Sequence, residues 1–214
     1  MRITHYGHAC LLVETGSARL LFDPGVLSDG FQALDGLDAI LVTHQHADHV
    51  DPQAVADLQR SNPGALLVAH PATIDAAGLA GASPAIPGDD LRIAGSTVQV
   101  RGGRHALIYE DFPDFENLAF LVDDGAFLHP GDSFEQPEGP VDVLAVPVAG
   151  PWVKVGDAIG YLRAVAPRVA VPFHEGDLAD TATVFEMLQL FTPEGTVFTP
   201  LASGVATDMG KERS

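Results

Sequence analysis

The stretch that decides the fold is Thr43-His-Gln-His-Ala-Asp-His49, which gathers three histidines and one aspartate within six positions. It follows a mostly apolar segment that we expect to form a buried strand. In an extended loop, side chains two residues apart project to the same side, so His44 and His46 can converge on one ion. Asp48 and His49 lie where the chain turns toward a helix, and their side chains can point to a second, adjacent position. A solvated histidine-rich loop is the competing interpretation, but so many ligand groups in so few residues favour a metal site.

Further candidate ligands stand where later strands are expected to end: His105, Asp132 and His174. Each of them alone is also consistent with an ordinary turn residue. Imidazole and carboxylate groups are ligands for zinc, iron and manganese. A pair of ions needs more ligands than one loop supplies, so we expect the ends of several strands to meet around the site.

The order of the apolar segments predicts two similar halves, each with strands followed by alternating helices and strands. In the first half we expect strands at 2–6, 10–14, 19–22, 38–43 and 65–69, a helix from Pro52 that stops at Asn62-Pro-Gly64, and a helix at 71–79. In the second half we expect strands at 91–93, 97–101, 117–122, 126–129, 141–148 and 168–173, and helices at 157–165 and 181–191. Two mixed sheets packed face to face with helices outside would bury these elements. The sequence therefore predicts an α/β fold, a four-layer αββα sandwich in a single domain over residues 1–214.

The chain of 214 residues carries 29 acidic and 11 basic side chains, a formal net charge of −18. A field of that sign repels phosphate groups, which argues against nucleic acids and anionic membrane surfaces as partners. A small-molecule substrate is still compatible, because a bound metal can invert the local charge. Cys10 is the only cysteine, so the chain has no internal disulfide. We find no apolar run long enough for a signal peptide or a membrane helix and expect a cytoplasmic protein, with no prediction of its oligomeric state.

The histidine loop resembles the signature of the metallo-β-lactamase superfamily, and the later single His, the Gly-Asp pair and the final His follow in the family's order. The segment Leu21-Phe-Asp-Pro-Gly25 resembles the motif after the family's opening hairpin. The resemblance implies two divalent metal ions, with zinc favoured and manganese or iron also compatible. It implies one ion held by His44, His46 and His105, a second held by Asp48, His49 and His174, and Asp132 bridging the two.

Two further segments point to one branch of that superfamily. The opening Tyr6-Gly-His-Ala-Cys-Leu-Leu-Val-Glu14 resembles the Gly-His-Ser start of small metal-dependent hydrolases related to ascorbate-6-phosphate lactonases, and the segment from Val146 to His174 resembles their closing motif. This chain is shorter than those lactonases, so their substrate is not carried over. His46 stands where the flavodiiron oxygen reductases have Glu, and Cys10 is not placed as the cysteine ligand of secreted zinc β-lactamases. The nuclease branches need extra arms, and the hydroxyacylglutathione hydrolases need a C-terminal helical extension.

The leading hypothesis is a dinuclear metal-dependent hydrolase that acts on a small ester, lactone or amide. Two ions can hold a hydroxide between them and lower its pKa to about 7. Asp48 would orient this nucleophile or take its proton. The alternatives are a phosphodiesterase, for which only Arg104 and Lys154 could clamp a phosphate, and a metal-loaded protein that binds a metabolite without turnover. The ligand types alone also allow a mononuclear iron oxygenase.

Several other residues have two interpretations each. Asp23 either supports a ligand histidine or is a turn residue, and His8 either lies near the site or is a buried structural histidine. For His5, His70 and His129 the structural interpretation is favoured. The segment 104–117 either covers the site with Tyr109, Phe112 and Phe115 or is a solvated acidic loop, and Trp152 either faces the pocket or anchors its loop.

Overall fold

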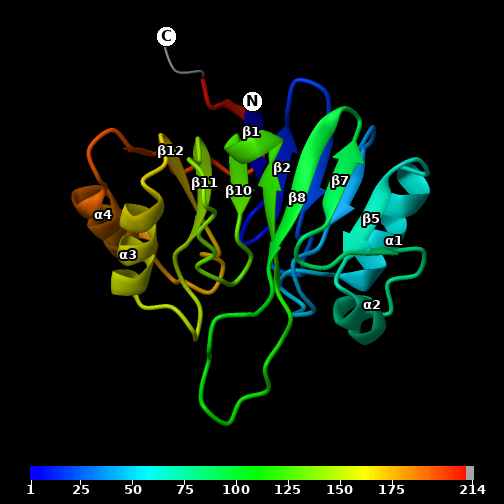
Figure 1. Ribbon diagram of the computed structural model, residues 1–214, viewed down its shortest axis with the longest axis horizontal. Coiled ribbons are helices and arrows are strands. Elements are labelled where there is room, and N and C mark those ends of the chain that lie inside the picture. Colours follow the sequence, from blue (N-terminus) through cyan, green and yellow to red (C-terminus); the bar gives the residue numbers. More distant parts are fainter. Residues whose placement is uncertain (211–214) are drawn as a thin grey trace.

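The computed structural model describes residues 1–210 and consists, in that range, of two mixed seven-stranded sheets with two helices on each outer side (Figure 1). The first sheet has the order β14-β1-β2-β3-β4-β5-β6 and the second the order β13-β12-β11-β10-β9-β8-β7. The four-layer αββα sandwich predicted from the sequence is therefore confirmed.

The elements of the first half, with the strand that closes its sheet, are β1 (Arg2–His5), β2 (Leu11–Glu14), β3 (Arg19–Phe22), β4 (Ala39–Leu41), α1 (Pro52–Ser61), β5 (Leu66–Ala69), α2 (Pro71–Ala77), β6 (Ser83–Pro84) and β14 (Thr207–Asp208). Those of the second half are β7 (Asp90–Ile93), β8 (Ser96–Gly102), β9 (Leu118–Val122), the 3-10 turn η1 (Asp123–Gly125), β10 (Phe127–His129), β11 (Val143–Pro147), α3 (Val155–Val165), β12 (Val169–Phe173), α4 (Ala182–Phe191) and β13 (Val197–Phe198). No helix within residues 1–210 has the length and apolarity needed to cross a membrane.

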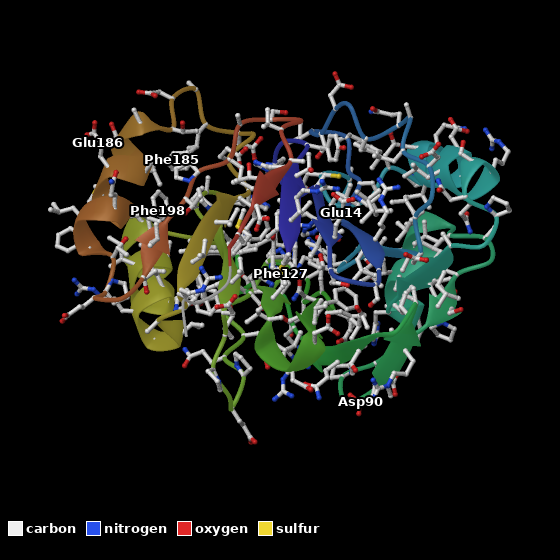
Figure 2. The ribbon with its side chains drawn as sticks, turned by 90° about the horizontal axis from the view of Figure 1, so that it is seen from above. Glu14, Asp90, Phe127, Phe185, Glu186 and Phe198 are labelled. Carbon is white, nitrogen blue, oxygen red and sulfur yellow. The ribbon has the colours of Figure 1, made fainter. Side chains whose placement is uncertain are left out.

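The buried apolar side chains form three clusters, one between the two sheets and one between each sheet and its helices. Along β3, Leu20 and Phe22 point into the layer between the sheets, whereas Leu21 points to the layer beneath α1 and α2. This period of two is what a strand covered on both faces requires. Figure 2 shows Phe127 in the middle of the molecule, where its ring lies 5.5 Å from that of Phe22, and Glu186 of α4 at the outside.

The ends of α1 form where the sequence predicts them. Asp51 caps the helix by accepting hydrogen bonds from the backbone N–H groups of Gln53 and Ala54. Pro52 occupies the first turn, where its missing N–H costs nothing. At the other end Asn62 accepts a hydrogen bond from the backbone N–H of Leu37, which holds the helix end to the preceding loop.

Three strands of two residues each, β6, β13 and β14, are not predicted from the sequence. Such short segments carry no alternating pattern, and each is defined by the strand beside it. α3 also begins at Val155 rather than 157, because the Asp157 side chain accepts a hydrogen bond from the backbone N–H of Lys154 and so extends the first turn. α2 ends at Ala77 because Gly78 adopts the left-handed conformation, with φ of 62°.

His129 is a core residue, as the structural interpretation held, and its ring stacks on Phe22 at 5.2 Å. Its Nδ1 accepts a hydrogen bond from the backbone N–H of Gly131, and its Nε2 donates to the carbonyl of Ala9. Burial lowers the pKa of this imidazole from 6.5 to about 4. The folded chain therefore keeps His129 neutral at pH values where the unfolded chain protonates it.

This difference predicts an acid-sensitive fold. A depressed histidine pKa gives a stability contribution that is complete above about pH 6.5 and is lost as the pH falls toward 4. Between pH 7 and pH 4, metal-free wild type should lose about 3 kcal/mol more free energy of unfolding than the variant His129→Asn, which does not titrate and can still accept from Gly131. Urea denaturation at both pH values measures the difference, and equal losses in the two proteins would contradict it.

Candidate metal centre

The predicted ligands lie at one end of the sandwich, because the strands that precede them end there. The loop with His44, His46, Asp48 and His49 follows β4, Asp132 follows β10, and His174 follows β12. His105 lies in the segment 103–117 between β8 and β9. This segment extends beyond the sheets at the end opposite the N-terminus (green in Figure 1). All seven predicted ligands are therefore brought together, from both sheets.

Their ligand atoms fall into two groups. Within each group these atoms lie within 4.8 Å of one another. The first group is His44, His46, His105 and Asp132, and the second is His8, Asp48, His49 and His174. This division matches the two positions expected from the sequence and adds His8 to the second. His8 thus lies at the site, the first of its two interpretations.

Asp132 lies between the two groups. Its Oδ1 is 3.1 Å from His49 Nε2, and its Oδ2 is 3.2 Å from the Nε2 atoms of both His105 and His174. The residue is only 2% exposed, so water does not compensate its charge. The carboxylate is therefore within reach of candidate ligand atoms of both groups.

The unpaired polar atoms of the site fit a metal. Four buried atoms form no hydrogen bond of acceptable geometry with any residue in the range 1–210: His49 Nε2, His174 Nδ1, His174 Nε2 and Asp132 Oδ1. Orphaned buried polar atoms cost about 1–3 kcal/mol each, so such a cluster in one place needs an explanation. Cations bound by imidazole nitrogen and carboxylate oxygen would satisfy three of these atoms: His49 Nε2, His174 Nε2 and Asp132 Oδ1. The same ligand types suit zinc, manganese and iron.

Asp23 orients a candidate ligand histidine in each group. Its Oδ2 accepts a hydrogen bond of 2.8 Å from His49 Nδ1, which turns His49 Nε2 toward the site. Asp23 also accepts two hydrogen bonds from Thr43, both of 2.7 Å: Oδ1 accepts from the backbone N–H and Oδ2 accepts from the hydroxyl. Because the Thr43 hydroxyl donates to Asp23, it accepts the proton of His44 Nδ1 at 3.0 Å. Asp23 therefore has the supporting role, since such contacts fix the tautomer of metal-binding imidazoles.

Burial and charge polarise the site before any metal binds. Burial lowers the pKa of His44 well below its usual value, so this imidazole is neutral. Burial also acts to lower the pKa of His49, but the carboxylates of Asp132 and Asp23 raise it well above the usual value. For Asp132 burial acts to raise the pKa, but His49 and His174 hold it well below the usual range. A metal that takes His49 Nε2 must displace a proton, so its affinity falls as the pH falls.

The backbone is in the left-handed region at three positions of the site. The φ angles are 49° at His8, 43° at Asp23 and 66° at His174. This conformation costs a residue with a side chain of the order of 1 kcal/mol, and it persists where surrounding contacts impose it. Two of these positions are joined directly, because the backbone N–H of His174 donates a hydrogen bond to the carbonyl of His8 at 2.8 Å.

An open cleft of about 890 Å³ is lined by the chain neighbours of two members of the first group, Arg104 and Ala106 beside His105 and Ser133 beside Asp132. Trp152 lines it and donates a hydrogen bond of 2.9 Å from Nε1 to Asp132 Oδ2. Trp152 therefore faces the pocket, and it also fixes the central carboxylate. The other side chains at the cleft include Arg104, Leu107, Glu116, Phe134 and Glu135.

The segment 103–117 combines both of its interpretations. The Phe115 ring packs edge-to-face 4.6 Å from that of His46, so this aromatic side chain lies against a predicted ligand. Tyr109 and Phe112, by contrast, are 65% and 48% exposed in the middle part of the segment. An ion pair between Arg104 and Asp114 closes its base.

The remaining two histidines have structural partners. His70 caps α2, accepting a hydrogen bond from the backbone N–H of Ala72 at 3.2 Å. His5 Nε2 donates to the carbonyl of His8 at 3.0 Å and supports that residue from behind.

Three comparisons with known proteins agree with this geometry. A family model described as "Beta-lactamase superfamily domain" matches residues 2–174. Protein Rv0786c of Mycobacterium tuberculosis is 47% identical over 186 residues, which are 85% of this chain and 87% of that protein. A UPF0173 metal-dependent hydrolase of Carboxydothermus hydrogenoformans is 31% identical over 81% of this chain and 84% of that one. The metallo-β-lactamase fold protein YhfI from Bacillus subtilis superposes with a TM-score of 0.73 at 18% identity, covering 96% and 98% of the two chains.

The contact between Gly25 and the histidine loop yields a test of the site. A Cβ at Gly25 would lie 1.9 Å from the carbonyl oxygen of Asp48 and 2.6 Å from the backbone nitrogen of His49. Gly25→Ala should therefore displace the loop, weaken metal binding by about tenfold or more and destabilise the fold by about 1–3 kcal/mol. Gly16→Ala is the matched control, since a Cβ there meets nothing within 4 Å. Metal content at fixed free zinc and urea denaturation measure both effects, and wild-type values for Gly25→Ala would show that the loop does not need this contact.

Proposed function

The chain belongs to the β-lactamase superfamily and is a metal-dependent hydrolase, and from this premise we propose that it uses two divalent metal ions to hydrolyse a small ester, lactone or amide. The observation that carries the proposal is the position of Asp132, within 3.2 Å of ligand atoms in both groups. We assign His44, His46 and His105 to one ion and Asp48, His49 and His174 to the other, with Asp132 shared. Zinc is our first choice of metal.

The residues of the site determine what such a centre can do. Two divalent ions, if bound by these residues, would lower the pKa of a bound water molecule and would polarise the substrate oxygen that becomes negative. Asp48 would orient that water or take its proton, because its side chain is 25% exposed whereas that of Asp132 is only 3% exposed. Burial acts to raise the pKa of Asp48, but its hydrogen bond with His8 and the charges of His49 and His174 lower it below the usual range. Asp48 is therefore ionised and able to accept a hydrogen bond.

The cleft beside the first group is where we place the substrate. Its lining includes the apolar side chains of Trp152, Phe134 and Leu107, together with two carboxylates, Glu116 and Glu135. Two divalent ions would change the net charge of −18 only to about −14, so the surface stays acidic while the centre becomes cationic. A neutral or singly charged small molecule suits this arrangement, and a polyanion would be repelled.

The phosphodiesterase alternative has less support. Phosphate groups are usually held by arginine or lysine side chains. Arg104 lines the cleft, but its guanidinium is engaged in the ion pair with Asp114. The proposal therefore keeps carboxylic esters, lactones and amides as the substrate class.

Replacing the shared carboxylate tests the proposal. Asp132→Ala should lower the hydrolysis of simple esters or lactones by about tenfold or more, because it removes the group between the two metal positions. Glu186→Ala, on the outer side of α4, is the control and should leave the rate unchanged. The measurement is kcat/KM on a panel of esters, lactones, amides, thioesters and phosphodiesters, with metal content determined on the same samples.

Other results would point elsewhere. Full activity in Asp132→Ala would overturn the proposed role of this residue. Turnover of phosphodiesters alone would favour the phosphodiesterase. Two tightly bound ions with no turnover on the whole panel would favour a binding protein.

A further inference from the structure

His8 is a completely buried histidine that lies outside the seven proposed ligands. The chain holds its backbone firmly: the carbonyl of His8 accepts hydrogen bonds from the backbone N–H of His174 at 2.8 Å and from His5 Nε2 at 3.0 Å. These contacts fix the turn between β1 and β2 against the end of β12. The imidazole is therefore delivered to the second group in one orientation.

Both ring nitrogens of His8 have partners. The backbone N–H of Gly176 donates to Nδ1 at 2.9 Å, and Nε2 lies 2.9 Å from Asp48 Oδ2. A backbone N–H can only donate, so Nδ1 is an acceptor and carries no proton. In the neutral ring the proton must then sit on Nε2, which donates it to the Asp48 carboxylate. The surroundings of the ring thus determine its tautomer.

This tautomer decides between two roles. The position of His8 in the second group would allow it to bind a metal. A ligand imidazole, however, must offer a lone pair. Here the Nδ1 lone pair is taken by Gly176, and Nε2 holds the proton directed at Asp48.

The ring also has little room to turn. A Cβ at Gly176 would lie 2.8 Å from His8 Nδ1, so the chain passes directly over this edge of the ring. On another side the rings of His8 and His174 lie 4.0 Å apart. Reorienting His8 toward a metal would break both of its hydrogen bonds in a buried place, which is costly.

We propose that His8 is a positioning residue: as the Nε2–H tautomer it donates to Asp48 Oδ2 and directs that carboxylate toward the second metal position, without binding the metal. The inference rests on the proposed two-metal centre and is independent of the substrate. It explains why a histidine from the first turn of the chain is buried beside a loop that begins about 35 residues later. Such supporting contacts typically change metal affinity or activity by about 10–100-fold.

Two amide variants separate the two hydrogen bonds of His8. The short amide of His8→Asn can accept from Gly176 in place of Nδ1, but it does not reach Asp48. The longer amide of His8→Gln can place an N–H near the position of Nε2 and donate to Asp48. His70→Asn is the matched control, because His70 caps α2 and asparagine also caps helices.

The experiment titrates Co²⁺ and Zn²⁺ into metal-free protein and follows Co²⁺ absorption and bound metal. In His8→Gln the second equivalent should bind within about threefold of wild type with an unchanged Co²⁺ spectrum. In His8→Asn it should bind about tenfold or more weakly. The first equivalent should bind equally in both variants and in His70→Asn.

Each other pattern overturns the inference. Loss of the second ion in His8→Gln, with a changed Co²⁺ spectrum, would make His8 a ligand. Normal binding in His8→Asn with loss in His8→Gln would make the contact with Gly176 the important one, and normal binding in both would leave His8 without a role at the metal. Wild type that binds a single equivalent would overturn the two-metal proposal itself, and this result is visible before any variant is measured.

Discussion

The buried carboxylate of Asp23 is the interaction on which the rest of the site depends. Asp23 is fully buried and accepts hydrogen bonds from the backbone and hydroxyl of Thr43 and from His49 Nδ1. A buried carboxylate without such partners would be very costly, so these contacts hold the end of β3 to the histidine loop. Through the Thr43 hydroxyl the same carboxylate also orients His44. One side chain that follows a strand of the first sheet therefore orients an imidazole in each of the two candidate ligand groups.

The second sheet completes the arrangement from the opposite side. Asp132 and His174 extend from the ends of β10 and β12, and Trp152 holds the Asp132 carboxylate in place. Behind them the stacked rings of Phe22 and His129 join the two sheets in the apolar layer. The candidate metal centre is thus a set of mostly buried polar groups supported by a packed apolar core, and such support helps to place ligands accurately.

Short-range patterns allowed much of this to be predicted. The apolar run that ends at Phe22 predicted a strand, and Asp51 with Pro52 predicted the start of α1. The histidine loop predicted a metal site because its ligand types and spacing are rare without one. The two-residue strands could not be predicted in this way. β14, for example, is a strand only because Thr207 and Asp208 pair with β1 at the other end of the chain.

The sequence by itself determined the layered fold, the position of the histidine loop and the candidate ligands, because apolar strand segments, helix capping and ligand spacing act within a few residues. Only the tertiary structure decided the partners of His8, which meets Asp48 across 40 residues and Gly176 across 168. It also decided that Trp152 donates to Asp132 and that Asp23 serves both groups of ligands. These contacts depend on how the two sheets pack together, and no local pattern in the chain records that packing.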